Sequence, residues 1–183
     1  MKKEPTLNDT VREAIGQALI RMLETLPFEK ITVSELARVA GVSRSSFYRN
    51  YDSTRDVLAD YIGTIYRGFF RGTTIPRAET ETEGRAAFLL PRFRFIRDHA
   101  REFTALRKNG LLLYVFESMD RKLILRKGGL EDSASFYYEA LTAGACAGLV
   151  GRWIDRGFRE SPEEMAALLA GIPLRKRGNG EDV

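Results

Sequence analysis

The sequence has 183 residues, of which 44% are hydrophobic, so it can bury the core of one ordinary domain or of a small module joined to a larger one. The formal net charge of +4 and the pI near 9.3 are mildly basic, which suits a nucleic acid or an anionic membrane but proves neither. The single cysteine, Cys146, excludes an internal disulfide and a cysteine-based metal site.

Export and membrane signals are not evident in the sequence. The first residues, MKKEPTLNDT, carry two lysines with no apolar stretch after them, which argues against a secretory signal. The longest uncharged apolar run, residues 140–151, is too short to span a bilayer. We therefore expect a cytoplasmic protein with no membrane partner.

Apolar residues recur every three or four positions along the N-terminal third, which predicts helices. They are expected at residues 9–26, 33–40, 44–51 and 53–70. Asn8 would cap the first helix and Pro27 would end it. Thr32 and Glu35 form a capping box for the second helix, which would end at Gly41 because glycine allows the positive φ of an abrupt turn.

A polar stretch, GTTIPRAETETEG at residues 72–84, predicts a break or a flexible connection before the C-terminal part. Helical patterns resume at residues 84–98, 102–108, 131–157 and 162–169. Asn109 and Gly110 read as a helix stop, and Ser161 and Glu164 as the capping box of the last helix. The tail from residue 173 onward is polar and is expected to fray.

These patterns predict an all-α fold of about nine helices, because no strand-like alternation persists. Residues 1–52 would form a three-helix domain that contains a helix-turn-helix. Residues 53–183 would form a second helical domain, with the start of its first helix, residues 53–70, connecting the two.

The helix after Gly41 carries a cluster of cationic and hydroxyl side chains. Four arginines and one aspartate lie between Arg38 and Arg55. At helical spacing the outward residues are Arg44, Ser45, Tyr48 and Arg49. Arginine can donate two hydrogen bonds to guanine, and hydroxyl groups can bind bases or phosphates, so this face suits DNA. The alternative is an ordinary solvated helix face.

The stretch KITVSELARVAGVSRSSFYRNYDSTRDVLADYI resembles the N-terminal DNA-binding domain of the TetR family of bacterial regulators, over roughly residues 8–70. The resemblance implies base contacts from Arg44, Ser45, Ser46 and Arg49, and phosphate contacts from Thr32, Tyr48 and Asn50. Two positions depart from the family pattern. Asn50 stands where the family usually has an aromatic residue or a histidine. Thr54 and Arg55 stand where it has a lysine, and Arg55 replaces that phosphate contact only if it reaches the same strand.

The stretch SFYYEALTAGACAGLVGRWIDRGFRESPEEMAALLAG resembles a branch of the same family that includes activators of dihydroxyacetone-kinase operons. In the family the last two helices pair with those of a second subunit, which implies a homodimer. Residues with a small or apolar side chain would form this interface: Ala140, Gly144, Gly148, Gly151, Met165, Leu168 and Leu169. Packing within one subunit is the alternative.

The resemblance implies that residues 1–52 are the DNA-binding domain and residues 53–183 the regulatory and dimerisation domain. Regulators of this family usually respond to a small molecule in the C-terminal domain. The aromatic residues Phe116, Tyr137 and Trp153 are candidates to contact such a ligand, although aromatic residues at helical spacing are more often core. His99 lies in a polar stretch and is expected at the surface or at a cap. The sequence contains no phosphate loop and no dinucleotide fingerprint, so we expect no enzyme activity, cofactor or metal site.

Three classes of function follow. The chain would be a TetR-like regulator, most often a repressor, that binds a palindromic operator as a dimer and is released or shifted by a small molecule. It could instead be a DNA-binding activator or a co-regulator whose C-terminal domain docks a partner protein. The third class is an enzyme or helical adaptor that borrowed the fold.

Overall fold

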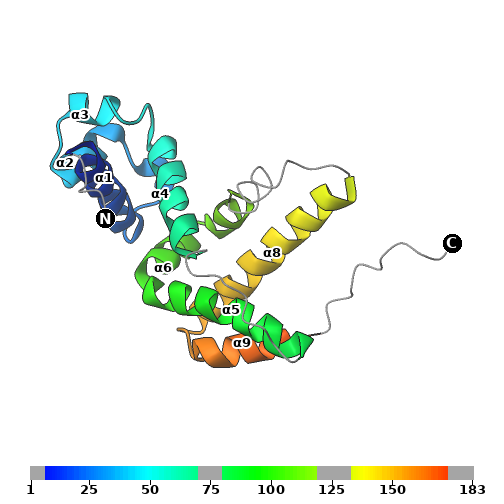
Figure 1. Cartoon of the computed structure of the whole chain (residues 1–183). Helices are drawn as coiled ribbons and strands as arrows, with labels where there is room; N and C mark the ends of the chain where they lie inside the picture. Colours follow the sequence, from blue (N-terminus) through cyan, green and yellow to red (C-terminus); the bar gives the residue numbers. More distant parts are fainter. Residues whose placement is uncertain (1–6, 70–79, 119–132, 173–183) are drawn as a thin grey trace.

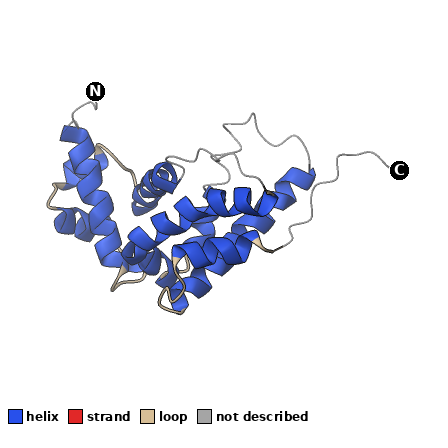
Figure 2. Cartoon of the chain, turned by 60° about the horizontal axis from the view of Figure 1, so that its bottom comes forward, coloured by secondary structure: helices blue, strands red, loops and turns tan. Residues whose placement is uncertain are grey.

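The computed structural model describes residues 7–69, 80–118 and 133–172 of the chain (Figure 1). In these residues helices alternate with turns and no strand is present, as the view coloured by secondary structure shows (Figure 2). The prediction of an all-α fold is therefore confirmed.

The N-terminal part contains five short or medium helices: α1 (Leu7–Leu23), the 3-10 helix η1 (Phe28–Lys30), α2 (Val33–Ala40), α3 (Arg44–Tyr48) and α4 (Thr54–Phe69). Helix α1 differs from the prediction at both ends. Asn8 lies inside it rather than at its cap, and the helix ends at Leu23 because a turn follows, in which Thr25 and Leu26 both donate their amide N–H to Met22 O.

The C-terminal part begins with α5 (Glu81–Asp98) and α6 (Ala100–Lys108), and residues 112–118 are also helical. Helix α5 starts earlier than predicted because Thr80 and Glu83 form a capping box, so the last residues of the expected polar break are helical. The rest of that break, and the polar tail, lie outside the described residues.

The chain then continues in α8 (Ser133–Asp155) and α9 (Pro162–Ala170). The capping box of Ser161 and Glu164 at the start of α9 is confirmed. Helix α9 runs along α5 (Figure 1). Trp153 of α8 packs edge-on against Phe93 of α5, with ring centroids 5.4 Å apart, and against Phe158 after α8, with centroids 5.0 Å apart.

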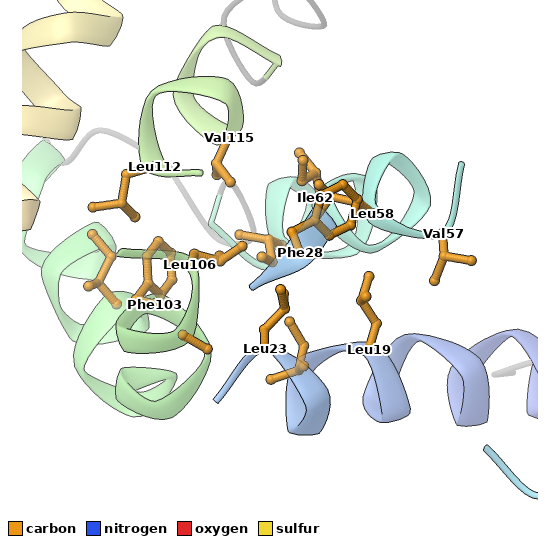
Figure 3. Packing of buried hydrophobic residues seen from close by; sticks show 14 of the residues in the cluster. Leu19, Leu23, Phe28, Val57, Leu58, Ile62, Phe103, Leu106, Leu112 and Val115 are labelled. Atoms are coloured by element: carbon orange, nitrogen blue, oxygen red, sulfur yellow. The ribbon is translucent and has the colours of Figure 1, made fainter. Parts of the chain in front are cut away.

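One hydrophobic core joins the N-terminal helices to α6 and the helical residues 112–118 (Figure 3). Phe28 of η1 lies between Ile62 of α4 and Leu106 of α6, with Leu23 of α1 nearby. All four side chains are buried. The N-terminal helices α1, η1 and α4 are therefore packed against the C-terminal part rather than connected to it by a linker alone.

Candidate nucleic-acid interface

Gly41 sets the direction in which α3 leaves α2. Its backbone is in the left-handed region, with φ 69° and ψ 27°, and the next residue, Val42, donates its amide N–H to Ala37 O at 3.0 Å. A residue with a Cβ would be strained at this φ. The predicted end of the second helix, and the glycine turn after it, are confirmed.

Three serine hydroxyls organise the first turn of α3. Ser43 caps the helix by accepting a hydrogen bond from Ser46 N at 3.0 Å. Its Oγ also lies 2.9 Å from Ser45 Oγ and donates to Ser46 Oγ at 3.0 Å. The hydroxyls of Ser45 and Ser46 are thus held close together at the start of the helix.

Helix α3 is shorter than predicted, because it ends at Tyr48 instead of Tyr51. The Asn50 side chain donates its Nδ2–H to Ser46 O at 2.9 Å, while the Asn50 backbone N–H bonds to Phe47 O. The Ser46 carbonyl, which would accept the next helical hydrogen bond from the Asn50 backbone N–H, is instead bound by the Asn50 side chain. This favours a turn at the end of the helix. Arg49 and Asn50 therefore lie in the turn that follows α3.

One side of α3 faces the protein and the other faces solvent. Phe47 is fully buried, whereas Arg44, Ser45, Tyr48 and Arg49 are exposed. Tyr48 is 49% exposed, and its ring rests edge-on against Phe47 at a centroid distance of 5.7 Å. The outward face predicted from helical spacing is present, and Ser46 lies half-buried beside it.

The remaining predicted contact residues lie at the starts of two neighbouring helices. The Thr32 hydroxyl caps α2 by accepting from Glu35 N at 3.2 Å, and it donates to Glu35 Oε2 at 2.8 Å. Arg55 is exposed in the first turn of α4. Asp56, next to it, accepts hydrogen bonds from the N–H and the hydroxyl of Ser53.

A polar cluster of Arg12, Tyr51 and Asp60, which the sequence did not predict, links α1, the segment after α3 and α4. Asp60 of α4 accepts a 2.7 Å hydrogen bond from the Tyr51 hydroxyl and two hydrogen bonds from the Arg12 guanidinium of α1. Burial raises the pKa of Tyr51 to about 12, with help from its bond to Asp60. Burial alone would raise the pKa of Asp60, but the hydrogen bonds from Tyr51 and Arg12 together lower it below its ordinary value.

The residues predicted for a dimer interface divide into two groups. Ala140, Gly144, Gly148 and Leu168 are exposed, with 62% of Leu168 accessible, and Leu169 is half-buried. Gly151 and Met165 are buried within the chain. An added Cβ at Gly151 would lie 3.2 Å from the Arg107 side chain of the same chain.

The three predicted ligand residues are in different environments. Phe116 and Trp153 are buried, and the Trp153 indole donates to Glu160 O at 3.0 Å, whereas Tyr137 is 70% exposed. A surface hollow of about 330 Å³ is lined by residues 23–27, Glu29, Lys108 and Asn109, and so by none of the three. Phe116 and Trp153 are therefore core residues, whereas Tyr137 lies at the surface.

Metal and membrane features are also absent from the described part of the chain. Within residues 7–69, 80–118 and 133–172 no three acidic, histidine or cysteine side chains are grouped as metal ligands would be. In the same ranges no helix combines the length and the apolar character needed to cross a bilayer. His99 is half-buried between α5 and α6, with its ring centroid 4.3 Å from that of Phe95.

Comparison with known families matches two regions of the chain. Residues 15–61 match the bacterial regulatory proteins of the tetR family, and residues 108–172 match a transcriptional regulator C-terminal region. Together these regions cover more than half of the chain. The first contains α2 and α3, and the second contains α8 and α9.

Curated relatives match only part of the chain. It is 35% identical over 91 residues to the nucleoid occlusion factor SlmA of Shewanella loihica, which covers 49% of this chain and 45% of that protein. The chain therefore spans less than half the length of the curated relatives it matches.

Solved structures resemble the chain over most of its length. The fatty acid degradation regulator FadR from Bacillus halodurans has a TM-score of 0.60 at 14% identity, over 96% of this chain and 100% of that one. The dihydroxyacetone kinase operon activator DhaS has a TM-score of 0.51 at 17% identity, over 88% of this chain and 93% of that one. At such low identity these likenesses establish the fold alone.

Proposed function

Because this chain belongs to the TetR family of bacterial transcriptional regulators, we propose that it binds a palindromic operator as a homodimer and acts as a repressor that a small molecule releases. Each part of this proposal has a different support in the molecule. The DNA-reading part is carried by α3, the dimer by α8, and the release by the C-terminal domain as a whole.

The exposed face of α3 is the observation that carries the proposal. Arg44 and Ser45 lie at the start of the helix, where a recognition helix entering the major groove brings its side chains to base edges. Arg44 is exposed and would donate two hydrogen bonds to guanine O6 and N7. Ser45 and Ser46 would read neighbouring bases, and Arg49 would reach the groove from the turn after the helix.

Phosphate contacts would come from groups around α3. Tyr48 presents a half-exposed phenol, and Thr32 caps the start of α2, where the helix itself supplies no acceptor for its first amides. Asn50 has one amide hydrogen on Ser46 O and a second one to donate. Arg55 would add a cation at the start of α4, where the carboxylate of Asp56 is turned to Ser53.

The dimer would form through α8 and α9. Tyr137, Leu141, Gly144 and Gly148 recur at spacings of four, three and four, so they share one helix face, and all four are exposed. Leu141 is 68% exposed and Tyr137 70%, so this face presents adjacent apolar side chains that a partner would cover. The glycines would let a second α8 approach closely, and Leu168 and Leu169 would extend the contact along α9. Gly151 and Met165, which are buried within the chain, would pack beneath the residues of this face.

The proposal is tested by binding of the purified protein to the DNA upstream of its own gene. Fluorescence anisotropy with the native sequence and with a scrambled sequence of equal length, repeated across a salt series, measures both specificity and charge contacts. We expect tighter binding to the native DNA by at least about 1000-fold, and affinity that falls steeply with salt. Equal affinity for both DNAs would refute sequence reading.

The sign of regulation and the effector need a second experiment. A reporter gene under the upstream DNA should be silenced by the chain and restored when a small molecule that raises its melting temperature is added. Activation of the reporter, or co-purification of a defined second protein with the C-terminal half, would instead support the activator or co-regulator.

A further inference from the structure

The side chain of Asn109, at the end of α6, bonds to two separate backbone positions of the N-terminal helices. Its Oδ1 accepts from Phe28 N at 2.9 Å, and its Nδ2 donates to Leu23 O at 2.8 Å. The same Nδ2 also donates to Ala105 O, one turn earlier in α6, at 2.9 Å. One amide group thus links α6 to the end of α1 and to the start of η1.

We infer that Asn109 is a positioning residue that couples α6 to the placement of the DNA-reading helices. The inference rests on the proposed function in one respect, namely that those helices bind DNA. The coupling itself is a property of the contacts between α6, α1 and η1, and it can be measured with or without DNA.

The two backbone groups that Asn109 binds are ones that their own helices leave unpaired. Leu23 is the last residue of α1, so no later residue of that helix reaches its carbonyl. Phe28 is the first residue of η1, so its N–H lacks a partner within that helix. Asn109 satisfies both and thereby fixes the chain segment between them, which includes Pro27.

The position of Asn109 is in turn fixed by the way α6 ends. Leu111 donates its N–H back to Leu106 O at 2.9 Å, and Gly110 donates to Arg107 O at 3.1 Å with its φ at +67°. These bonds close α6 with a defined turn, of the kind that a left-handed glycine allows. A shift of α6 along or around its axis would therefore carry Asn109 with it.

The path from Asn109 to the reading helices is short. Phe28 is bound by its N–H to Asn109, and its side chain is buried between Leu106 and Ile62 (Figure 3). Ile31, also buried, follows in the same segment, and Thr32 begins α2 directly after it. A displacement of Phe28 would thus reach the start of α2 through four residues of chain.

A second contact between the same helices serves as a matched control. Arg101 of α6 binds Glu24, just after α1, with an N–O distance of 2.9 Å. Its side chain is 76% exposed, so solvent screens this ion pair. Asn109 is half-buried and makes neutral hydrogen bonds to backbone groups. Loss of the Arg101–Glu24 ion pair should therefore change the coupling little, and loss of the Asn109 hydrogen bonds should change it strongly.

The test compares hydrogen exchange of three variants with that of the wild type, with and without saturating upstream DNA. Asn109→Asp has the same shape and keeps an acceptor for Phe28 N, but it places a carboxylate oxygen against Leu23 O. Arg101→Gln removes the exposed ion pair. Ile96→Val creates a small defect in the buried layer of α5, involves none of the hydrogen bonds of Asn109, and controls for lost stability.

In the wild type we expect DNA to slow exchange of the α6 amides by at least about threefold, because coupling between two sites is reciprocal. Arg101→Gln and Ile96→Val should keep this slowing. Asn109→Asp should lose it while still binding the DNA. Slowing of α6 that survives in Asn109→Asp, or that is absent from the wild type when DNA is bound, would overturn the inference.

A measurement without DNA separates this inference from the proposed function. Asn109→Ala removes the acceptor of Phe28 N, so we expect the Phe28 amide to exchange at least about tenfold faster in this variant than in the wild type, with α6 amides less affected. If the wild type does not bind DNA, the proposed function fails and this comparison still stands. Equal Phe28 exchange in the wild type and Asn109→Ala would overturn the coupling.

Discussion

The Tyr51 hydroxyl donates a 2.7 Å hydrogen bond to the Asp60 carboxylate. The same carboxylate binds Arg12, whose side chain comes from α1. One acidic side chain of α4 therefore holds both α1 and the segment that follows α3. The orientation of the recognition helix thus depends on a residue that does not need to touch DNA.

Replacing Asp60 should loosen this arrangement. We expect Asp60→Asn to lower the free energy of unfolding by about 1–2 kcal/mol, because charge-assisted hydrogen bonds are lost from a partly exposed site. Urea denaturation measures this. Asp155→Asn is the control, because it breaks an exposed ion pair with Arg107 and should leave the curve nearly unchanged. Equal effects of the two changes would contradict the role given to Asp60.

The contribution of Asp60 should depend on pH. Its pKa is lower in the folded protein than in the unfolded chain, so its stabilising effect is complete above the ordinary aspartate value of about 4 and is lost as the pH falls through the lower folded value. The difference in stability between wild type and Asp60→Asn should therefore shrink on acidification below about pH 4. A difference that stays constant down to pH 2 would show that Asp60 does not titrate in this way.

The contribution of the Tyr51 hydroxyl to stability should depend on pH in the alkaline range. Its pKa is raised to about 12, above the ordinary value of about 10, so the neutral phenol stabilises the fold below pH 10 and this effect is lost as the pH rises towards 12. Tyr51→Phe cannot ionise and should show no such loss. Spectrophotometric titration of the tyrosines, wild type against Tyr51→Phe, isolates the Tyr51 phenol, because Tyr61, whose pKa is also raised by burial, is present in both proteins.

Two substitutions on the outward face of α3 should weaken DNA binding in different ways. Arg44→Ala should cost about 1–3 kcal/mol and relax the preference for one base pair, because a bidentate contact to guanine is lost. Tyr48→Ala should weaken binding to all sequences alike. Arg94→Ala, an exposed arginine of α5 paired with Glu163, is the control and should bind normally. Anisotropy against a set of single-base operator variants distinguishes these patterns.

The dimer can be tested at a glycine. No described atom lies within 4 Å of a Cβ placed on Gly148, apart from its own helix and chain neighbours, so Gly148→Arg should leave the subunit folded. It should nevertheless block close approach of a second α8. We expect a monomer by light scattering with an unchanged circular dichroism spectrum. The exposed change Gln17→Arg on α1 should remain a dimer, and a dimeric Gly148→Arg would exclude this face.

Local sequence signals predicted the local features well. The capping box of Thr32 and Glu35, the glycine turn at Gly41 and the start of α9 are confirmed, because each depends on residues a few positions apart. The same kind of signal at Thr80 and Glu83 was present but was interpreted as part of a polar break. The early end of α3 depends on the Asn50 side chain, which binds Ser46 O in place of a backbone N–H, and spacing does not reveal this.

Tertiary contacts could not be predicted in this way. Asp60 and Arg12 are 48 positions apart, and Asn109 is 81 positions from Phe28 and 86 from Leu23. Periodicity shows that a helix has a buried face but does not identify its neighbour. For the same reason Gly151, read from sequence as part of an outer stripe, lies against Arg107.

The core around Phe28 limits how the chain can be divided for protein engineering. A fragment ending with α4 would leave Phe28, Ile62 and Leu23 without the cover that α6 and the helical residues 112–118 provide. Such a fragment would expose an apolar surface and should be prone to aggregate. A chimera that joins the N-terminal helices to the regulatory domain of another protein would therefore also need the α6 residues that cover Phe28.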